Sequence, residues 1–211
     1  MRKFTRPIHT ARIVKVTLKN TRILFYASIA NILVCALIFV FLLAEDRRLL
    51  LSVLLAEYCL FFILMLVYFI RILLRFNEAT AIVAAYTMFT CILAISGIDI
   101  VFPRLLGAGS TWLGTLTEVI SLLVAFRSFF VKAPAVSLPF KLFGAGVGLV
   151  TLPRLFVLLV PANFNEGLIS ITGDIGILTI LLASSFILKR MIDYLKNEAE
   201  QPVKIEGEQT P

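Results

Sequence analysis

The sequence predicts an all-α, polytopic membrane protein: a bundle of six transmembrane helices with both termini in the cytoplasm. Hydrophobic residues make up 60% of the 211 residues and the mean hydropathy is +0.98, more apolar surface than a compact soluble core can hide. These residues form runs close to the roughly 20 residues that a helix needs to cross a bilayer. Most of the net charge of +7 lies directly beside these runs, a pattern typical of charges that set membrane topology.

The chain opens with a basic arm, residues 1–22, which carries lysines and arginines and no acid. A cleaved signal peptide would continue into a short apolar core and a small-residue cleavage site. Here the first apolar run has full spanning length, so we expect a retained span. The arm should lie along anionic lipid headgroups, with Phe4, Ile8 and Val14 toward the lipid. An organellar transit peptide is the alternative, weakened by the shortage of serine.

Six spans follow, each an apolar stretch with polar or basic ends. Their expected bounds are 23–43, 49–70, 81–102, 112–131, 142–160 and 168–188. The second span is the clearest, because arginines bracket an apolar run of about 22 residues. Asn77 and Glu78 before the third span are typical of a helix start. The fourth span is the least apolar, since it contains Glu118 and Arg127.

The transmembrane domain, residues 23–190, is followed by a polar cytoplasmic tail, residues 191–211. We expect the last helix to continue to about Asn197 and the tail to be largely disordered, because it lacks apolar periodicity. Most lysines and arginines flank the spans on the side that both termini share. The positive-inside rule therefore predicts cytoplasmic termini. The plasma (inner) membrane is the expected location, with an organellar membrane as the alternative.

Five ionisable residues lie inside the predicted spans and form a candidate intramembrane polar cluster: Glu57, Asp99, Glu118, Arg154 and Asp174. At about 1.5 Å of rise per residue, all five belong to the outer half of the membrane. An acid at mid-span costs about 2.5 to 3.5 kcal/mol on insertion scales. Two interpretations remain open. The cluster is either a structural network in which Arg154 pairs with one acid, or an outward-open layer that holds a proton, a cation or an amine.

The fifth span contains features of close helix packing. Gly144 and Gly148 form a G-x-x-x-G pattern, which permits two helices to approach closely. Pro153 removes a backbone donor beside Arg154, so we expect a kink there. No strand precedes these glycines and the spacing of the third glycine is wrong, which excludes a nucleotide-binding loop.

A weak internal repeat is also present. Units of residues 23–75, 79–134 and 137–190 would each be one helical hairpin. In each, an acid precedes a basic residue by nearly the same interval, as in Glu57 with Arg71, Glu118 with Lys132 and Asp174 with Lys189. A triplicated hairpin and a coincidence favoured by the positive-inside rule are both compatible with this pattern.

The sequence offers little for catalysis, and we expect a protein that is not an enzyme. His9 is the single histidine and lies in the basic arm, which excludes Ser-His and Cys-His nucleophiles. Cys35, Cys59 and Cys91 lie on separate spans, so no metal site is predicted. No cofactor is expected either. Basic and aromatic residues are not interleaved outside the spans, which excludes nucleic acid as a partner.

These observations predict a small non-catalytic multi-pass membrane protein that serves as a subunit, scaffold or sensor module of a membrane assembly. Its expected partners are the lipid bilayer, anionic lipid headgroups through residues 1–22, and other membrane proteins. The alternative is a proton- or cation-handling transporter or channel-like protein. In that case Glu57, Glu118 and Asp174 would handle the ion and Arg154 would serve as the internal counter-ion.

Overall fold

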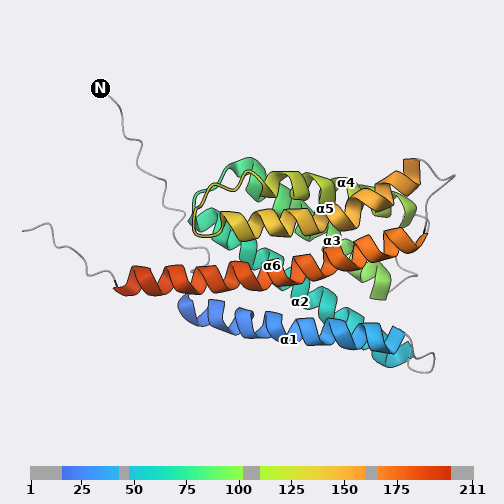
Figure 1. The fold of residues 1–211 in the computed structure, drawn as a ribbon, viewed down its shortest axis with the longest axis horizontal. Coiled ribbons are helices and arrows are strands. Elements are labelled where there is room, and N and C mark those ends of the chain that lie inside the picture. The colour runs from blue at the N-terminus through green and yellow to red at the C-terminus, as the bar shows by residue number, and fades with distance from the viewer. Residues whose placement is uncertain (1–15, 43–47, 102–109, 160–165, 201–211) are drawn as a thin grey trace, which may run out of the picture.

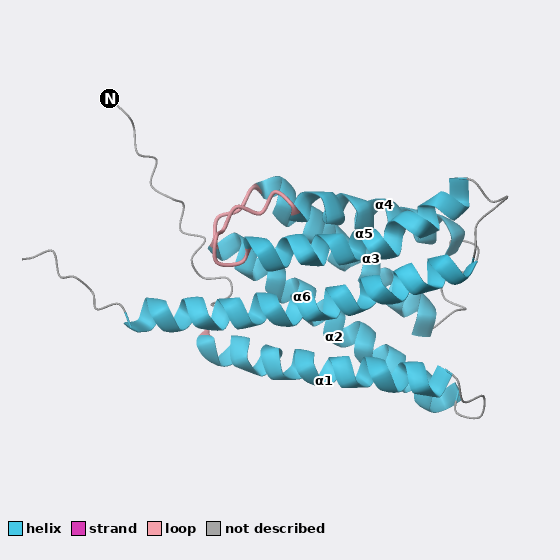
Figure 2. Cartoon of the chain, viewed as in Figure 1, coloured by secondary structure: helices cyan, strands magenta, loops and turns pink. Residues whose placement is uncertain are grey.

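The computed structural model describes residues 16–42, 48–101, 110–159 and 166–200, and within these ranges every regular element is a helix (Figures 1 and 2). The helices are α1 (Leu18–Leu42), α2 (Arg48–Arg75), α3 (Thr80–Val101), α4 (Ser110–Ser128), α5 (Ser137–Leu159) and α6 (Glu166–Glu200).

Four of these helices are long and apolar enough to cross a membrane. The qualifying stretches are Leu18–Ile38, Ala56–Arg75, Thr80–Gly97 and Ile169–Glu200. The prediction of an all-α chain is confirmed over the described residues, and four of its helices have the length and apolarity that spanning a membrane requires. The number of six spans and the cytoplasmic position of the termini stay predictions.

The helices form a ring in which each packs against its neighbours in sequence and α6 closes against α1 (Figure 1). The α5–α6 interface is the most extensive. α1 begins and α6 ends at the same end of the bundle, where residues 76–79 and 129–136 also connect helices. We call this the terminal end, and the opposite end, where α1 ends and α2 begins, the far end.

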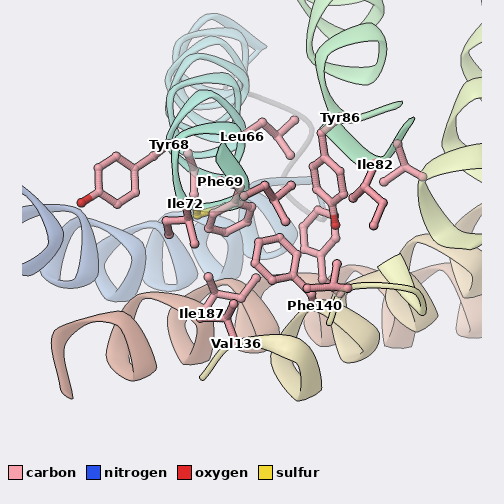
Figure 3. Packing of buried hydrophobic residues seen from close by; sticks show 14 of the residues in the cluster. Leu66, Tyr68, Phe69, Ile72, Ile82, Tyr86, Val136, Phe140 and Ile187 are labelled. Atoms are coloured by element: carbon pink, nitrogen blue, oxygen red, sulfur yellow. The ribbon is translucent and has the colours of Figure 1, made fainter. Parts of the chain in front are cut away.

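The packed core lies toward the terminal end. Phe69 of α2, Tyr86 of α3 and Phe140 and Phe143 of α5 are fully buried. Figure 3 shows Phe69, Tyr86 and Phe140 close together, and the Phe143 ring lies 5.7 Å from that of Phe69 and 5.9 Å from that of Tyr86, centroid to centroid. The ring centroids of Phe69 and Phe140 are 5.6 Å apart, and those of Tyr86 and Phe140 are 5.7 Å apart, both edge to face. Such contacts join α2, α3 and α5 across the centre of the ring and stabilise it by area burial and ring geometry.

Large apolar side chains are exposed on the outside of every helix. Tyr26 is 68% exposed, Leu60 61%, Trp112 82% and Leu182 63%. A soluble monomer rarely exposes contiguous apolar patches larger than a few hundred Å². Exposure on all sides of the bundle is what a lipid environment requires, so the surface agrees with the apolar helices in placing this chain among membrane proteins.

The last helix ends close to the limit that the sequence predicts. It runs to Glu200, against an expected end near Asn197. Met191, Ile192 and Leu195 are buried at helical spacing, so this part of the helix packs against the bundle. Residues 201–211, and the arm residues 1–15, lie outside the described ranges.

The connection between α2 and α3 also differs from the prediction. Asn77 has a positive φ of 53°, and the N–H of Glu78 donates to the carbonyl of Leu73 at 3.0 Å. This is the geometry of a helix C-terminus in which a left-handed residue ends the helix. Asn77 therefore ends α2, and α3 begins only at Thr80. Asparagine is common both at the start of a helix and in the left-handed conformation that ends one, so the residue type alone does not distinguish the two positions.

Candidate functional site

Two of the five predicted cluster residues meet directly. Nη1 of Arg154 on α5 donates to Oε1 of Glu118 on α4 at 3.4 Å, and the side chains are 57% and 15% exposed, respectively. The acid thus lies within the helix interface while much of the guanidinium lies at the surface. A single contact of this length is a weaker pairing than a bidentate arginine–carboxylate fork. It nevertheless gives Glu118, which is 15% exposed, a cation where an unpaired buried acid would be costly.

The other cluster residues do not join this pair. Asp174 on α6 is half-buried and close enough to Cys35 of α1 for an electrostatic interaction. Neither Asp174 nor Glu57 makes a hydrogen bond or ion pair with another residue in the described part of the chain. Asp99 belongs to α3, but its side chain lies outside what the structure describes. Among the four cluster residues whose side chains the structure describes, Glu118 and Arg154 are the pair in direct contact.

Glu57 lies on the outer face of α2. Val53, Leu60 and Leu64 are 58%, 61% and 53% exposed, and their spacing from Glu57 puts all four residues on one stripe of the helix. Glu57 itself is exposed. Leu66, which lies about half a turn round the helix from Glu57, is fully buried. The carboxylate therefore faces away from the core, among side chains that suit lipid.

Two pairs of side-chain hydroxyls connect neighbouring helices, and neither pair was predicted from the sequence. Thr21 of α1 and Tyr68 of α2 are 2.6 Å apart, oxygen to oxygen. The hydroxyls of Tyr86 on α3 and Ser128 on α4 are 2.7 Å apart. In both pairs the smaller hydroxyl already donates to its own helix, so the tyrosine must be the donor. Tyr68 and Tyr86 lie within apolar runs, but Thr21 lies in the basic arm and Ser128 follows Arg127, so no shared sequence pattern marks the pairs.

The α1–α6 interface contains polar groups of a different kind. The hydroxyls of Ser28 and Ser185 are 3.0 Å apart and join the two helices. One turn further along α1, Asn31 is 2% exposed, and neither its amide oxygen nor its amide nitrogen has a hydrogen-bond partner. Ser184 is fully buried with an unpaired hydroxyl. Orphaned groups of this kind are costly in an apolar interior.

The glycines of α5 pack against two different helices. A Cβ on Gly144 would lie 2.6 Å from the Cβ of Ser128, so this position faces α4. A Cβ on Gly146 would lie 3.0 Å from the carbonyl oxygen of Gly176, so it faces α6. Gly148 is looser, with the Cβ of Ala125 at 3.9 Å. Of the two glycines named from the sequence, Gly144 thus lies in a close contact with α4 and Gly148 in an ordinary one. Gly146 and Gly176, which the sequence pattern did not single out, form a second close crossing between α5 and α6.

Pro153 is half-buried inside α5, and the helix continues past it to Leu159. Its ring removes the donor that would otherwise bond the carbonyl of Leu149. Because it directly precedes Arg154, the weakened backbone lies beside the ion pair with Glu118. The structure thus places the predicted proline next to the predicted internal cation.

The terminal end is held by charged contacts to backbone. The carboxylate Oε1 of Glu78 accepts from the backbone N–H groups of Lys132 and Ala133 at 2.8 and 2.6 Å. Arg75 donates to the carbonyl of Val16 at 3.2 Å and pairs with Glu198 of α6. These contacts fasten the α2–α3 turn to the α4–α5 connection and the end of α2 to α1 and α6.

The described residues define a helical protein with four helices apolar enough to cross a membrane. Its helices are joined by hydroxyl pairs, close glycine contacts and the Glu118–Arg154 ion pair. Among the described residues there is no group of three or more His, Cys, Asp or Glu side chains that could hold a metal ion. Comparison with known proteins finds no matching family model, no similar curated protein and no similar solved structure. The functional argument therefore depends on the geometry alone.

Proposed function

We propose that this chain is a non-catalytic, multi-pass subunit or scaffold of a larger membrane assembly. The observation that carries the proposal is Glu57, an ionisable residue on the exposed stripe of α2 formed with Val53, Leu60 and Leu64. Side chains that face the core contribute to the stability of this chain. An acid that faces away from the core makes no such contribution, and we infer that it contacts a neighbouring membrane protein.

The energetics favour a protein neighbour at this position. A carboxylate near mid-span costs about 2.5 to 3.5 kcal/mol on insertion scales, whereas a neighbouring leucine recovers only about 0.3 to 0.6 kcal/mol. Glu57 makes no hydrogen bond or ion pair with the rest of the described chain. A partner helix that supplies a donor at the same depth removes this cost, since interhelical hydrogen bonds in membranes contribute about 0.6 to 2 kcal/mol.

The expected partner is a transmembrane helix with a lysine, arginine or side-chain amide facing Glu57. Leu60 and Leu64 would pack against its apolar surface on either side of the polar contact. A second copy of the chain also offers a cation, because Arg154 is 57% exposed on its side-chain surface. The partner in the assembly is therefore either a different membrane protein or a second copy of this chain.

The test is the mass of the particle extracted from its own membrane without detergent, in native nanodiscs. The wild-type chain, 23.5 kDa alone, should be recovered in a larger particle of defined stoichiometry. Glu57→Leu should release the single chain. Its thermal unfolding in detergent should be unchanged or higher, because the substitution removes a carboxylate that no group in this chain satisfies.

The matched control is Leu64→Ala, which lies on the same stripe and removes no polar group. It should leave the large particle intact. A wild-type chain recovered alone, or a Glu57→Leu particle of unchanged mass, would rule out the proposed role of Glu57.

We further infer that all six helices cross the plasma membrane with both termini in the cytoplasm. The support is that α1 begins and α6 ends at the terminal end. The last turns of α2 and α4 carry Arg75 and Arg127, and Lys132 lies in the connection that follows α4. Protease treatment of intact cells should leave a tag at either terminus uncut. Cleavage of either tag from outside would reverse the orientation.

A further inference from the structure

A groove opens between α1 and α6 at the terminal end. It is lined from α1 by Arg22, Phe25 and Tyr26, and from α6 by Lys189, Ile192, Asp193 and Lys196, around a volume of about 460 Å³. The spacing of each set puts it on a single face of its helix. Toward the far end the groove is bounded by the Ser28–Ser185 pair, one turn beyond Phe25 and Lys189.

The charge of the groove selects an anion. Arg22, Lys189 and Lys196 supply three cations against one carboxylate, Asp193. None of the three cations is committed to an ion pair within the described residues. Arginine and lysine together provide many donors for a phosphate, with arginine able to bind two of its oxygens at once. The carboxylate lies one helical turn from each lysine, on the same face of α6.

The rest of the lining selects an amphiphile over a small ion. Phe25, Tyr26 and Ile192 form an apolar floor beneath the cations. Further toward the far end, the same helix faces continue with exposed apolar side chains: Ile29 and Leu33 on α1, and Leu178 and Leu182 on α6. A basic opening that runs into an apolar track has the polarity of a phospholipid.

The groove also lies at the right level. α1 and α6 are both among the helices able to cross a membrane, and the lysines of α6 mark the transition from its apolar to its charged part. Basic pockets between transmembrane helices at such a boundary bind anionic headgroups. The guanidinium of Arg190 lies 5.2 Å from the centre of the Phe186 ring, so this neighbouring cation is held on its own helix beside the groove.

We propose that this groove is a binding site for an anionic phospholipid, with its phosphate at Arg22, Lys189 and Lys196 and an acyl chain along Ile29 and Leu182. The site differs from the diffuse attraction of residues 1–22 for a charged surface, because it is built jointly by the first and last helices. A bound lipid would fill the space between them and stabilise their contact. The proposal is independent of the role assigned to Glu57.

The experiment uses the full chain in a neutral detergent, titrated with phosphatidylglycerol or phosphatidylcholine and followed by native mass spectrometry. The wild type should bind phosphatidylglycerol and not phosphatidylcholine. The triple variant Arg22→Gln, Lys189→Gln, Lys196→Gln should lose on the order of 100-fold in affinity, about fivefold for each cation removed. The matched control Arg127→Gln, Lys132→Gln, Lys141→Gln removes equal charge at the same end, outside the groove, and should bind normally.

A second variant keeps the test decisive if the triple variant folds poorly. Asp193→Asn removes the one anion of the groove and should raise the affinity for phosphatidylglycerol about fivefold. Soluble glycerol phosphate distinguishes a lipid site from a free-phosphate site, and at matched concentration it should not displace the lipid. Displacement by glycerol phosphate, equal losses in both triple variants, or no gain with Asp193→Asn would each overturn the proposal.

Discussion

Gly146 of α5 lies directly against Gly176 of α6. A Cβ built on Gly146 would approach the carbonyl oxygen of Gly176 to 3.0 Å and the backbone nitrogen of Ile180 to 2.9 Å. The obstacles include backbone atoms, which cannot move aside as the end of a flexible side chain can. The α5–α6 interface, the most extensive in the bundle, thus depends on having glycine at both positions.

Gly146→Ala should therefore lower stability even though alanine is the better helix former. We expect a loss of about 1 to 3 kcal/mol from overpacking, seen as a lower Tm in detergent. Gly173→Ala is the matched control, because nothing lies within 4 Å of its Cβ position. It should gain up to about 1 kcal/mol from helix propensity. Equal effects at the two positions would contradict the close crossing.

The Tyr86–Ser128 pair should respond unequally to removal of its two partners. Tyr86→Phe leaves Ser128 still bonded to the carbonyl of Val124 and should cost about 0.5 to 1.5 kcal/mol. Ser128→Ala leaves the fully buried hydroxyl of Tyr86 without an acceptor and should cost more, about 1 to 3 kcal/mol. Thermal unfolding of the two variants in the same detergent measures this order. The reverse order would show that the tyrosine is not the donor.

Asn31→Leu should stabilise the isolated protein. The substitution removes two buried amide atoms that have no hydrogen-bond partner and adds apolar contact between α1 and α6, worth about 1 to 3 kcal/mol. Asn20→Leu, at an exposed position of the same helix, serves as the control and should change Tm little. A destabilised Asn31→Leu variant would show that the amide does have a binding partner.

Glu78→Ala should loosen the terminal end. Two backbone N–H groups, of Lys132 and Ala133, lose a charged acceptor, and hydrogen bonds to charged groups contribute about 1.5 to 3 kcal/mol each. Hydrogen exchange should rise around residues 129–136. Glu198→Ala breaks a more exposed ion pair, with side chains 31% and 50% exposed, and should cost at most about 1 kcal/mol. Similar exchange in both variants would argue against the role of Glu78.

The transport alternative makes an opposite prediction about the acids. If Glu118 and Asp174 carried protons or cations, Glu118→Gln and Asp174→Asn would abolish a pH-driven flux in proteoliposomes without changing folding. The separation of Asp174 and Glu57 from the Glu118–Arg154 pair leads us to expect no such flux from the wild type. A flux above empty vesicles that both substitutions remove would favour the transporter instead.

The sequence predicts the helices well, because their signal is additive along the chain. Each apolar run averages over many residues, so the run beginning at Leu49 appears as α2 with no knowledge of its neighbours. The helix limits shift where local backbone geometry decides them. α3 begins at Thr80 and not at Asn77, because Asn77 takes a positive φ and ends α2.

The polar interior is predicted less well, because pairing depends on helix rotation. Sequence depth puts Glu57 and Glu118 at a similar level, yet Glu57 faces outward and Glu118 faces Arg154. Neutral contacts are harder still. The residue type does not distinguish Ser28, whose hydroxyl contacts both its own helix and Ser185 of α6, from a residue such as Thr179, which bonds to its own helix.

The closure of α6 onto α1 has a consequence for biosynthesis. A ribosome delivers α1 to the bilayer first and α6 last, so the face of α1 that carries Ser28 and Asn31 waits for its neighbour until translation is nearly over. During that interval its polar groups must be shielded by lipid or by an insertion factor. Insertion of the final hairpin, α5 and α6, is thus the step that completes the fold. A chain truncated before this hairpin would leave α1 without the α6 neighbour against which it packs.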